Sequence, residues 1–193
     1  MTTEPAIAAI VLAAGMSRRA GRRNKLLDDV GGRPMIAAVV TTVLASRAGP
    51  VIVVTGHQAA LVRDALAGQP VEFVENADYR SGMAGSIGCG LGALPASATG
   101  VMICLGDMPE VAVATLDRLI EAASARTEDD ILVPVEAGRR GNPVLFGRRW
   151  FAQLSRLDGD RGAKRVLDEN PDWVTAVVVD DSGIFIDYDG DGE

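Results

Sequence analysis

Residues 7–27 of this 193-residue chain read IAAIVLAAGMSRRAGRRNKLL. An apolar run that is typical of a buried strand leads into the small residues Ala13, Ala14 and Gly15, and four arginines and Lys25 follow between positions 18 and 25. Small side chains let backbone N–H groups approach an anion closely, and fixed positive charges then hold it. Because the whole chain has a formal charge of −7, this local reversal of sign predicts a binding site for a polyanion.

The composition is typical of one soluble globular domain, which we expect to span residues 1–193, with 188–193 as a candidate disordered tail. A pI near 4.8 argues against a general nucleic-acid binder. Cys89 and Cys104 form no Cys-x-x-Cys pair, so we expect reduced thiols. The N-terminus has no signal-peptide pattern, and no run approaches the roughly 20 apolar residues of a membrane span. These features predict a cytoplasmic protein that binds neither nucleic acid nor membrane.

Apolar runs and helical patterns alternate along the chain. The predicted strands are Ile7 to Leu12, Val51 to Thr55, Val71 to Val74, Val101 to Leu105, Ile131 to Val135 and Val174 to Val179, with another beginning at Asn142. The predicted helices are Met35 to Ser46, Gln58 to Leu66, Ser86 to Leu94, Val113 to Ala125 and Arg161 to Leu167. Strands that are apolar throughout are typical of strands covered on both faces. We therefore predict an α/β fold with a single-domain, Rossmann-like, doubly wound and mainly parallel sheet.

Two common phosphate-binding motifs do not account for the basic cluster. A P-loop requires Gly-Lys-Ser/Thr, and the chain has no such triplet. Residues 88–93 match the loose pattern G-x-G-x-x-A, but they lie inside a predicted helix and not after a strand. We expect these glycines to permit close packing or to form a helix start that faces a ligand.

The segment Leu12-Ala13-Ala14-Gly15-x-Ser17-x-Arg19-x-Gly21-x-x-Asn24-Lys25-Leu26 resembles the signature of nucleotidyltransferases that fold as one doubly wound domain. Supporting segments follow in the right order: Val53 to Gly56, Asn76 with Gly82 and Ser86, Leu105 to Pro109, Gly138 to Pro143 and Gly159 to Lys164. Over nearly its whole length, the chain is similar to the molybdenum cofactor cytidylyltransferase family, within the MobA-like NTP transferase superfamily. Two departures are Ala20, where the family usually has Met, and a tail that lacks the family's Thr-Pro step.

The resemblance implies that Arg19 binds the β- and γ-phosphates of a nucleotide and that Lys25 binds the α-phosphate. Asp107 ends a buried strand at the ligand-binding edge, and with Asp189 or Asp187 it could hold Mg²⁺ or Mn²⁺. Its structural alternative is to cap the following helix. For the acidic tail, the alternative is disorder.

Further contacts are implied by analogy. The residues expected at the nucleotide are Leu12, Ala13, Ala14, Gly15, Thr55, Gly56, Asn76 and Ser86. The residues expected at an anionic acceptor are Arg140, Asn142, Arg161 and Lys164. For Asn76 and Ser86, turn and cap roles are the alternative, and for the basic residues it is exposed surface charge. By resemblance alone, Ala14 favours CTP over GTP. We expect His57 to be structural.

The resemblance implies an enzyme that transfers CMP from CTP to the phosphate of molybdenum-bound molybdopterin and releases pyrophosphate. Such a reaction needs positioning and electrostatic stabilisation more than a nucleophilic side chain. The alternatives are a relative that uses GTP or another phosphorylated acceptor, such as a sugar or alcohol phosphate, and a non-catalytic protein that delivers the cofactor. We expect a monomer or weak oligomer, with a molybdoenzyme or its chaperone as a candidate partner.

Overall fold

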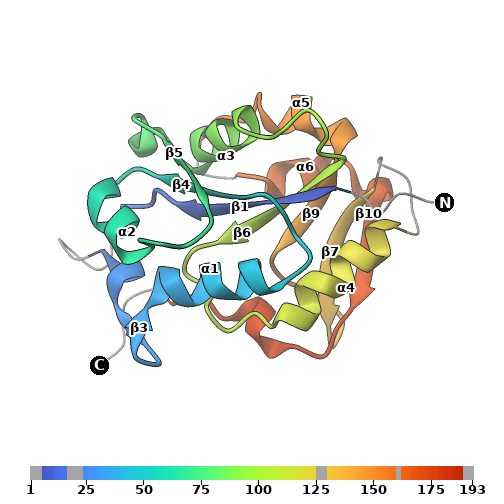
Figure 1. Cartoon of the computed structure of the whole chain (residues 1–193). Coiled ribbons are helices and arrows are strands. Elements are labelled where there is room, and N and C mark those ends of the chain that lie inside the picture. The colour runs from blue at the N-terminus through green and yellow to red at the C-terminus, as the bar shows by residue number, and fades with distance from the viewer. Residues whose placement is uncertain (1–5, 17–23, 125–129, 160–161, 189–193) are drawn as a thin grey trace.

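In the part of the chain that the structure describes, the fold is built on an eight-stranded sheet in which six strands run parallel. The computed structural model describes residues 6–16, 24–124, 130–159 and 162–188. The parallel strands are β1 (Ile7–Ala13), β4 (Val51–Thr55), β5 (Glu72–Glu75), β6 (Gly100–Leu105), β7 (Ile131–Glu136) and β10 (Val174–Val178) (Figure 1). With the antiparallel strand β9 (Val144–Gly147) between β6 and β7, the order across the sheet is β10-β7-β9-β6-β1-β4-β5. The prediction of a mainly parallel α/β sheet is confirmed.

Two strands run against this direction. Strand β9 (Val144–Gly147) lies antiparallel between β6 and β7, and β8 (Arg139–Arg140) pairs antiparallel with the end of β7. The two-residue turn before β8 has positive φ at Ala137 and Gly138, as type I′ hairpin turns require. As β9 is antiparallel, it begins at the edge where the parallel strands end. A separate two-stranded hairpin joins β2 (Asp29–Val30) and β3 (Arg33–Pro34).

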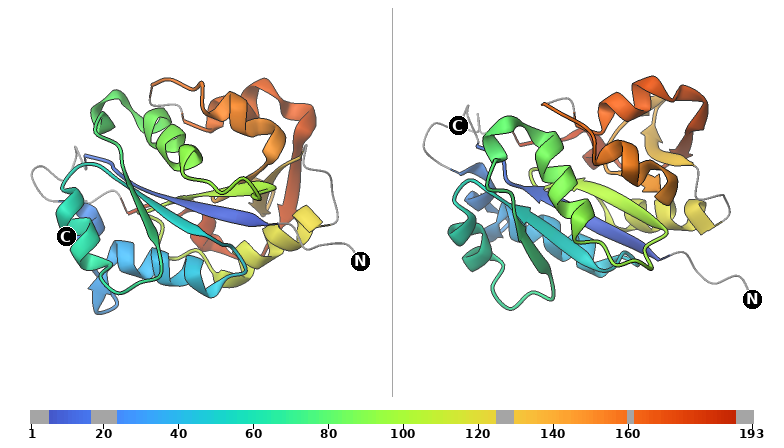
Figure 2. Two further views of the ribbon diagram at one scale, coloured as in Figure 1. Left: turned by 45° about the horizontal axis from the view of Figure 1, so that its top comes forward. Right: turned by 90° about the horizontal axis from the view of Figure 1, so that it is seen from above.

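Helices cover both faces of the sheet (Figures 1 and 2). On one face lie α1 (Met35–Ala45), α2 (Ala59–Ala65) and α4 (Val113–Ser124), and on the other lie α3 (Met83–Gly92), α5 (Phe151–Leu154) and α6 (Lys164–Glu169). Short 3₁₀ turns complete the described chain: Lys25–Leu27, Tyr79–Ser81, Arg148–Trp150, Pro171–Trp173 and Ser182–Phe185. Among the described helices, none is long and apolar enough to cross a membrane.

The central strands are buried because both faces carry apolar side chains. Residues of β1 alternate between the two cores: Val11 packs toward α1 and α4, and Ile10 packs toward α3. The glycines of the G-x-G-x-x-A pattern lie within α3, as predicted. A Cβ on Gly90 would come within 2.8 Å of the Ile10 side chain, so this glycine lets the helix approach β1 closely.

The strand order places the ligand-binding edge. From β1 the chain adds β4 and then β5 on one side of β1. It then returns to add β6 on the opposite side of β1. In open α/β sheets, such a reversal leaves a crevice beyond the carboxyl ends of the two strands. Ala14 and Gly15 follow β1, and Asp107 follows β6, so these residues flank the crevice.

Candidate active site at the carboxyl edge of the sheet

An ion pair joins the basic segment to the end of β6. Lys25 Nζ lies 2.7 Å from Asp107 Oδ2, although the residues are 82 positions apart. The two side chains are 14% and 23% exposed, so the pair is shielded but still reachable from solvent. Thus the structure brings together two of the three residues predicted to be catalytic. Arg19, the third, lies outside the described residues.

Asn24 fixes the position of Lys25. Its Oδ1 accepts a hydrogen bond from Leu26 N at 3.2 Å and caps the 3₁₀ turn that begins at Lys25. Its Nδ2 donates to the carbonyl oxygen of His57 at 3.5 Å, and Leu26 is buried. These contacts anchor the turn to the residues that follow β4. The backbone of Lys25 is therefore held in place, and its side chain extends from a fixed point.

The capping alternative for Asp107 is wrong. Helix α4 begins at Val113, and its cap comes from a distant residue, Asp181. Asp181 Oδ2 accepts from Ala112 N at 2.9 Å and from Thr115 Oγ1 at 2.6 Å. The carboxylate of Asp107 is therefore not used at the helix start, and it faces Lys25 instead.

The C-terminal segment reaches the same edge. Tyr188 N donates to the carbonyl oxygen of Asp107 at 2.9 Å, and Tyr188 Oη donates to Glu110 Oε1 at 2.5 Å, which raises the pKa of the phenol. Tyr188, which we expected to belong to a disordered tail, is held by these two bonds. The adjacent Asp187 is exposed, and Asp189 lies outside the described residues.

The carboxylates at this edge fit only part of a divalent-cation site. Among the described residues, no group of three or more His, Cys, Asp or Glu side chains is placed to hold a metal. Mg²⁺ does not require one, because it is usually held by one or two carboxylates together with substrate phosphates and water. Asp107 offers hard oxygen ligands in a partly exposed position, and its chemistry fits such a cation when a nucleotide completes the shell.

The ends of β1 and β4 leave space beside the ion pair. A Cβ on Gly15 would meet nothing within 4 Å, whereas one on Gly56 would lie 2.6 Å from Tyr79 Cβ and 2.9 Å from Ala14 Cβ. Gly15 therefore faces open space, and Gly56 is required by packing. His57 N donates to the Ala14 carbonyl at 3.3 Å, in keeping with a structural role for that residue.

Other predicted nucleotide-binding residues are used within the fold. Leu12 is half-buried and accepts from Gly106 N through its carbonyl, and Ala13 is fully buried. Thr55 is fully buried and its Oγ1 donates to the Val74 carbonyl at 3.4 Å, so its hydroxyl faces the neighbouring strand. These three residues contribute to the edge mainly through backbone.

Asn76 and Ser86 form a buried polar pair behind the crevice. Asn76 Nδ2 donates to Ser86 Oγ at 3.0 Å, and Asn76 Oδ1 accepts from Asp78 N at 3.0 Å. The pair joins the end of β5 to the first turns of α3. This geometry fits the turn role for Asn76, whereas Ser86 lies inside α3, which begins after Gly82, and caps no helix.

The predicted acceptor residues are divided between two places. Arg140 lies exposed on β8, and Asn142 N donates to the Ile184 carbonyl at 3.0 Å, so both belong to the edge beside β7. Lys164 is exposed at the start of α6, on the other face. The loop before α6 contacts α3, because Ala84 N donates to the Gly159 carbonyl at 3.2 Å. Arg161 lies outside the described residues.

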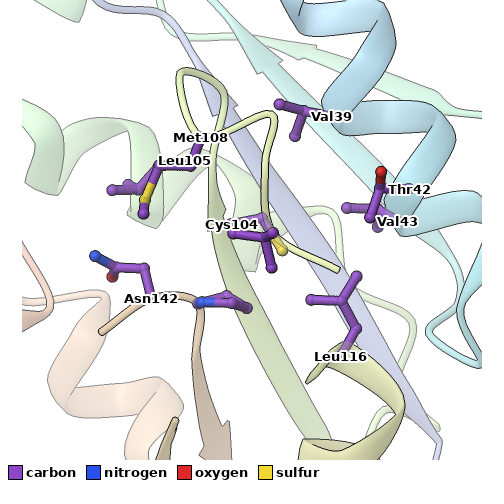
Figure 3. Close-up of a pocket in the computed structure, with 10 residues that line it drawn as sticks. Val39, Thr42, Val43, Cys104, Leu105, Met108, Leu116 and Asn142 are labelled. Carbon is purple, nitrogen blue, oxygen red and sulfur yellow. The ribbon is translucent and has the colours of Figure 1, made fainter. Parts of the chain in front are cut away.

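A small apolar pocket lies beneath the Asp107 loop (Figure 3). Its lining comes from α1, the end of β6, the loop after it, α4 and the start of β9: Val39, Thr42, Val43, Cys104, Leu105, Met108, Val111, Leu116, Asn142 and Pro143. Burial raises the pKa of the Cys104 thiol to about 12, so this cysteine is no nucleophile near neutral pH. The sequence carries no local signal for this pocket, nor for Tyr188, Glu110 and Asp181 as partners of the loop.

Comparison with known proteins agrees with this geometry. Residues 9–174 match the MobA-like NTP transferase domain. The structure of Rv0371c from Mycobacterium tuberculosis superimposes with a TM-score of 0.84 at 30% identity, over 97% of this chain and 94% of that one. A manganese complex of Rv0371c gives a TM-score of 0.78 at 30% identity, over 90% and 88% of the two chains.

Two relatives in sequence have different names. Nicotine blue oxidoreductase from Paenarthrobacter nicotinovorans is 30% identical over 92% of this chain and 88% of its own length. The bifunctional protein GlmU from Kineococcus radiotolerans is 37% identical over 77% of this chain but only 30% of its own length. The chain thus spans about a third of the GlmU proteins that it matches. With the domain match across most of its length and a doubly wound sheet bearing Lys25 and Asp107 at its crevice, the chain belongs to the MobA-like NTP transferase family.

Proposed function

We propose that this protein transfers CMP from CTP to the phosphate of molybdenum-bound molybdopterin, with Mg²⁺ or Mn²⁺ as cofactor, and releases pyrophosphate. The observation that carries the proposal is the Lys25–Asp107 ion pair at the crevice between β1 and β6. The pair puts a cation that suits phosphate beside a carboxylate that suits a metal ion, and these two charges support the proposal because nucleotidyl transfer needs both.

The reaction can proceed without a general base. A phosphate oxygen of the acceptor, already anionic at neutral pH, forms a bond to the α-phosphorus of CTP. The bond from that phosphorus to the bridging oxygen breaks, and its electron pair leaves with pyrophosphate. Lys25 would neutralise charge that builds on the α-phosphate, because its ammonium is a compact charge on a flexible stem. Arg19 would hold the β- and γ-phosphates.

Asp107 would hold the divalent cation, with Asp187 or Asp189 as a further ligand. When bound, such a cation supplies Lewis-acid neutralisation of the phosphate oxygens. The manganese complex of Rv0371c, at 30% identity, supports a divalent metal in this family. Lys25 at 2.7 Å currently neutralises the carboxylate, and we expect it to turn toward the α-phosphate when metal and nucleotide bind.

The choice of nucleotide and acceptor rests on position and on resemblance. Gly15 borders open space beside β1, where the base would lie, and the neighbouring Ala14, which is buried, favours cytosine by analogy. Arg140 and Asn142 lie at the same sheet edge and suit an anionic acceptor. Lys164 and Arg161 would act from the α6 side.

A pyrophosphate-release assay tests the proposal. The protein is incubated with Mg²⁺, each of the four nucleoside triphosphates and molybdenum-loaded molybdopterin. We expect release with CTP only, and loss of release in Lys25→Ala and Asp107→Ala. Arg118→Ala and Glu121→Ala remove a matched cation and anion from an exposed pair on α4, 3.6 Å apart, and should keep full activity.

Each other outcome rejects the proposal in a defined way. Release only with GTP, or only with a sugar or alcohol phosphate, assigns a related transferase. Tight nucleotide binding without release assigns a delivery protein. Conversion of nicotine blue without nucleotide-dependent release assigns the activity named for the relative from Paenarthrobacter nicotinovorans.

A further inference from the structure

Residues 181–188, which we call the C-terminal strap, lie along the loop of residues 106–112 that carries Asp107. The strap holds this loop near both ends. Tyr188 bonds to the Asp107 carbonyl and to Glu110 Oε1, and Asp181 Oδ2 accepts from Ala112 N. Between these points, a Cβ on Gly183 would lie 2.2 Å from the Glu110 carbonyl oxygen. Only glycine at 183 lets the two backbones meet this closely.

The strap also contacts the predicted acceptor side. The Ile184 carbonyl accepts from Asn142 N at 3.0 Å, and a Cβ on Gly141 would lie 2.6 Å from that same carbonyl oxygen. The guanidinium of Arg139 lies 4.3 Å from the centre of the Phe185 ring. One short segment therefore bridges the loop of Asp107 and the start of β9.

A small pocket lies beside the Asp107 loop. Leu105, Met108 and Val111 of the loop region line the small pocket shown in Figure 3, between α1 and α4. The polar contacts of the strap add to the apolar contacts of these residues in holding the loop that carries Asp107.

We propose that Tyr188 is a positioning residue, which holds the Asp107 loop so that the Asp107 carboxylate binds a divalent cation, and that the strap links this loop to the Asn142 segment. The proposal rests on the proposed function in one respect, the role of Asp107 as a metal ligand. Tyr188 acts through its phenol on Glu110 and through its backbone on Asp107. Its own side chain is not required to touch metal or substrate.

Mn²⁺ titration followed by electron paramagnetic resonance tests the first half. In Tyr188→Phe the ring stays and the bond to Glu110 is lost, and we expect Mn²⁺ affinity to fall about 3- to 10-fold, as for the loss of one hydrogen bond. Tyr188→Ala should lower it further. Glu110→Gln keeps an acceptor oxygen and should retain near-normal affinity. Ser124→Ala, which removes a hydroxyl bonded to the Ile120 carbonyl on α4, is the matched control.

Hydrogen exchange tests the second half. In Tyr188→Ala, we expect faster amide exchange in residues 106–112 and also in 139–142, because the strap contacts both. Faster exchange in 106–112 alone would overturn the link to the Asn142 segment. A global loss of protection would show unfolding, in which case Tyr188→Phe carries the test.

The two proposals fail separately. Unchanged Mn²⁺ affinity in both Tyr188 variants, with binding lost in Asp107→Asn, overturns the role of Tyr188 and leaves the proposed function standing. Normal Mn²⁺ affinity in Asp107→Asn overturns the metal role on which both depend. Weaker Mn²⁺ binding in Tyr188→Phe, with no CTP-dependent pyrophosphate release in wild type, supports the positioning role and rejects the cytidylyltransferase.

Discussion

Asp107 belongs to the loop between β6 and α4, and Asp181 contacts the end of that loop, but their carboxylates bind different partners. Asp181 accepts three hydrogen bonds from groups of the fold, from Ala112 N, Thr115 Oγ1 and Gly183 N. Asp107 faces the flexible ammonium of Lys25 at the mouth of the crevice. A carboxylate that accepts from several fixed donors stabilises a conformation. One that faces a single lysine ammonium can exchange it for a ligand, so the comparison supports a structural role for Asp181 and fits the role proposed for Asp107.

The largest effect should come from Asp107→Asn. The amide keeps the shape of the side chain but removes the charge, so we expect CTP-dependent turnover to fall by about 1000-fold or more. Thermal stability should change little, because the residue makes no helix cap. Parallel assays of initial rate and melting temperature check this. A large drop in melting temperature with residual turnover would reverse the comparison.

Asp181→Ala should have the opposite profile. The variant loses the cap of α4 and the bond to Thr115, and we expect the free energy of unfolding to fall by about 2 kcal/mol. This corresponds to a decrease of about 4 to 8 °C in melting temperature for a chain of this size. Urea unfolding measures it. Turnover well below the melting temperature should remain within about 10-fold of wild type, and wild-type stability would contradict the assignment.

Lys25→Met tests whether the lysine ammonium and a divalent cation compete for the Asp107 carboxylate. Without nucleotide, the ammonium competes with a divalent cation for the Asp107 carboxylate, so its removal should raise Mn²⁺ affinity about 3- to 10-fold. Calorimetric titration of the nucleotide-free protein measures this. Turnover should nevertheless be lost, because the α-phosphate loses its cation. Weaker Mn²⁺ binding in the variant would exclude competition between Lys25 and the metal.

The smallest effect concerns Cys104, which lies on β6 and lines the pocket beside the same loop. Burial raises its pKa from 9.0 to about 12. A raised pKa in the folded state contributes stability that is complete below pH 9 and is lost between pH 9 and 12. We therefore expect Cys104→Ala to remove part of the decline in stability over that range, measured by urea unfolding at pH 8 and pH 10. An identical decline in wild type and variant would contradict this.

Much of the fold could be predicted because the central strands are buried on both faces. The range Val51 to Thr55 is that of β4, and the predicted strand at Ile7 extends by one residue. The start of α3 was wrong by three residues, because its glycines weaken the helical signal. This helix begins at Met83 after Gly82, with φ of 118°, and its packing on β1 outweighs its low propensity. The two-residue strands β2, β3 and β8 were not predicted.

The part of the site formed by residues that directly follow strands could be predicted. The part that depends on contacts between the C-terminal segment and the loop after β6 could not. Lys25 and Asp107 were predicted at one edge, and they lie in contact. Tyr188 and Asp181 make their contacts with residues about 70 to 80 positions away, and no local pattern signals such pairing. The acidic, glycine-rich end of the chain also has the composition of a disordered tail, which concealed the role of Tyr188.

The antiparallel course of β9 divides the edge into two halves with separate origins. One half consists of the carboxyl ends of the parallel strands β1, β4 and β6. The other half consists of the beginning of β9, together with Asn142 and the hairpin of β7 and β8 that precede it. The hairpin turn and the entry segment are consecutive in sequence, from Ala137 to Asn142, so substitutions within this one short segment would change the entering half of the edge and leave the sequence at the ends of β1, β4 and β6 unaltered.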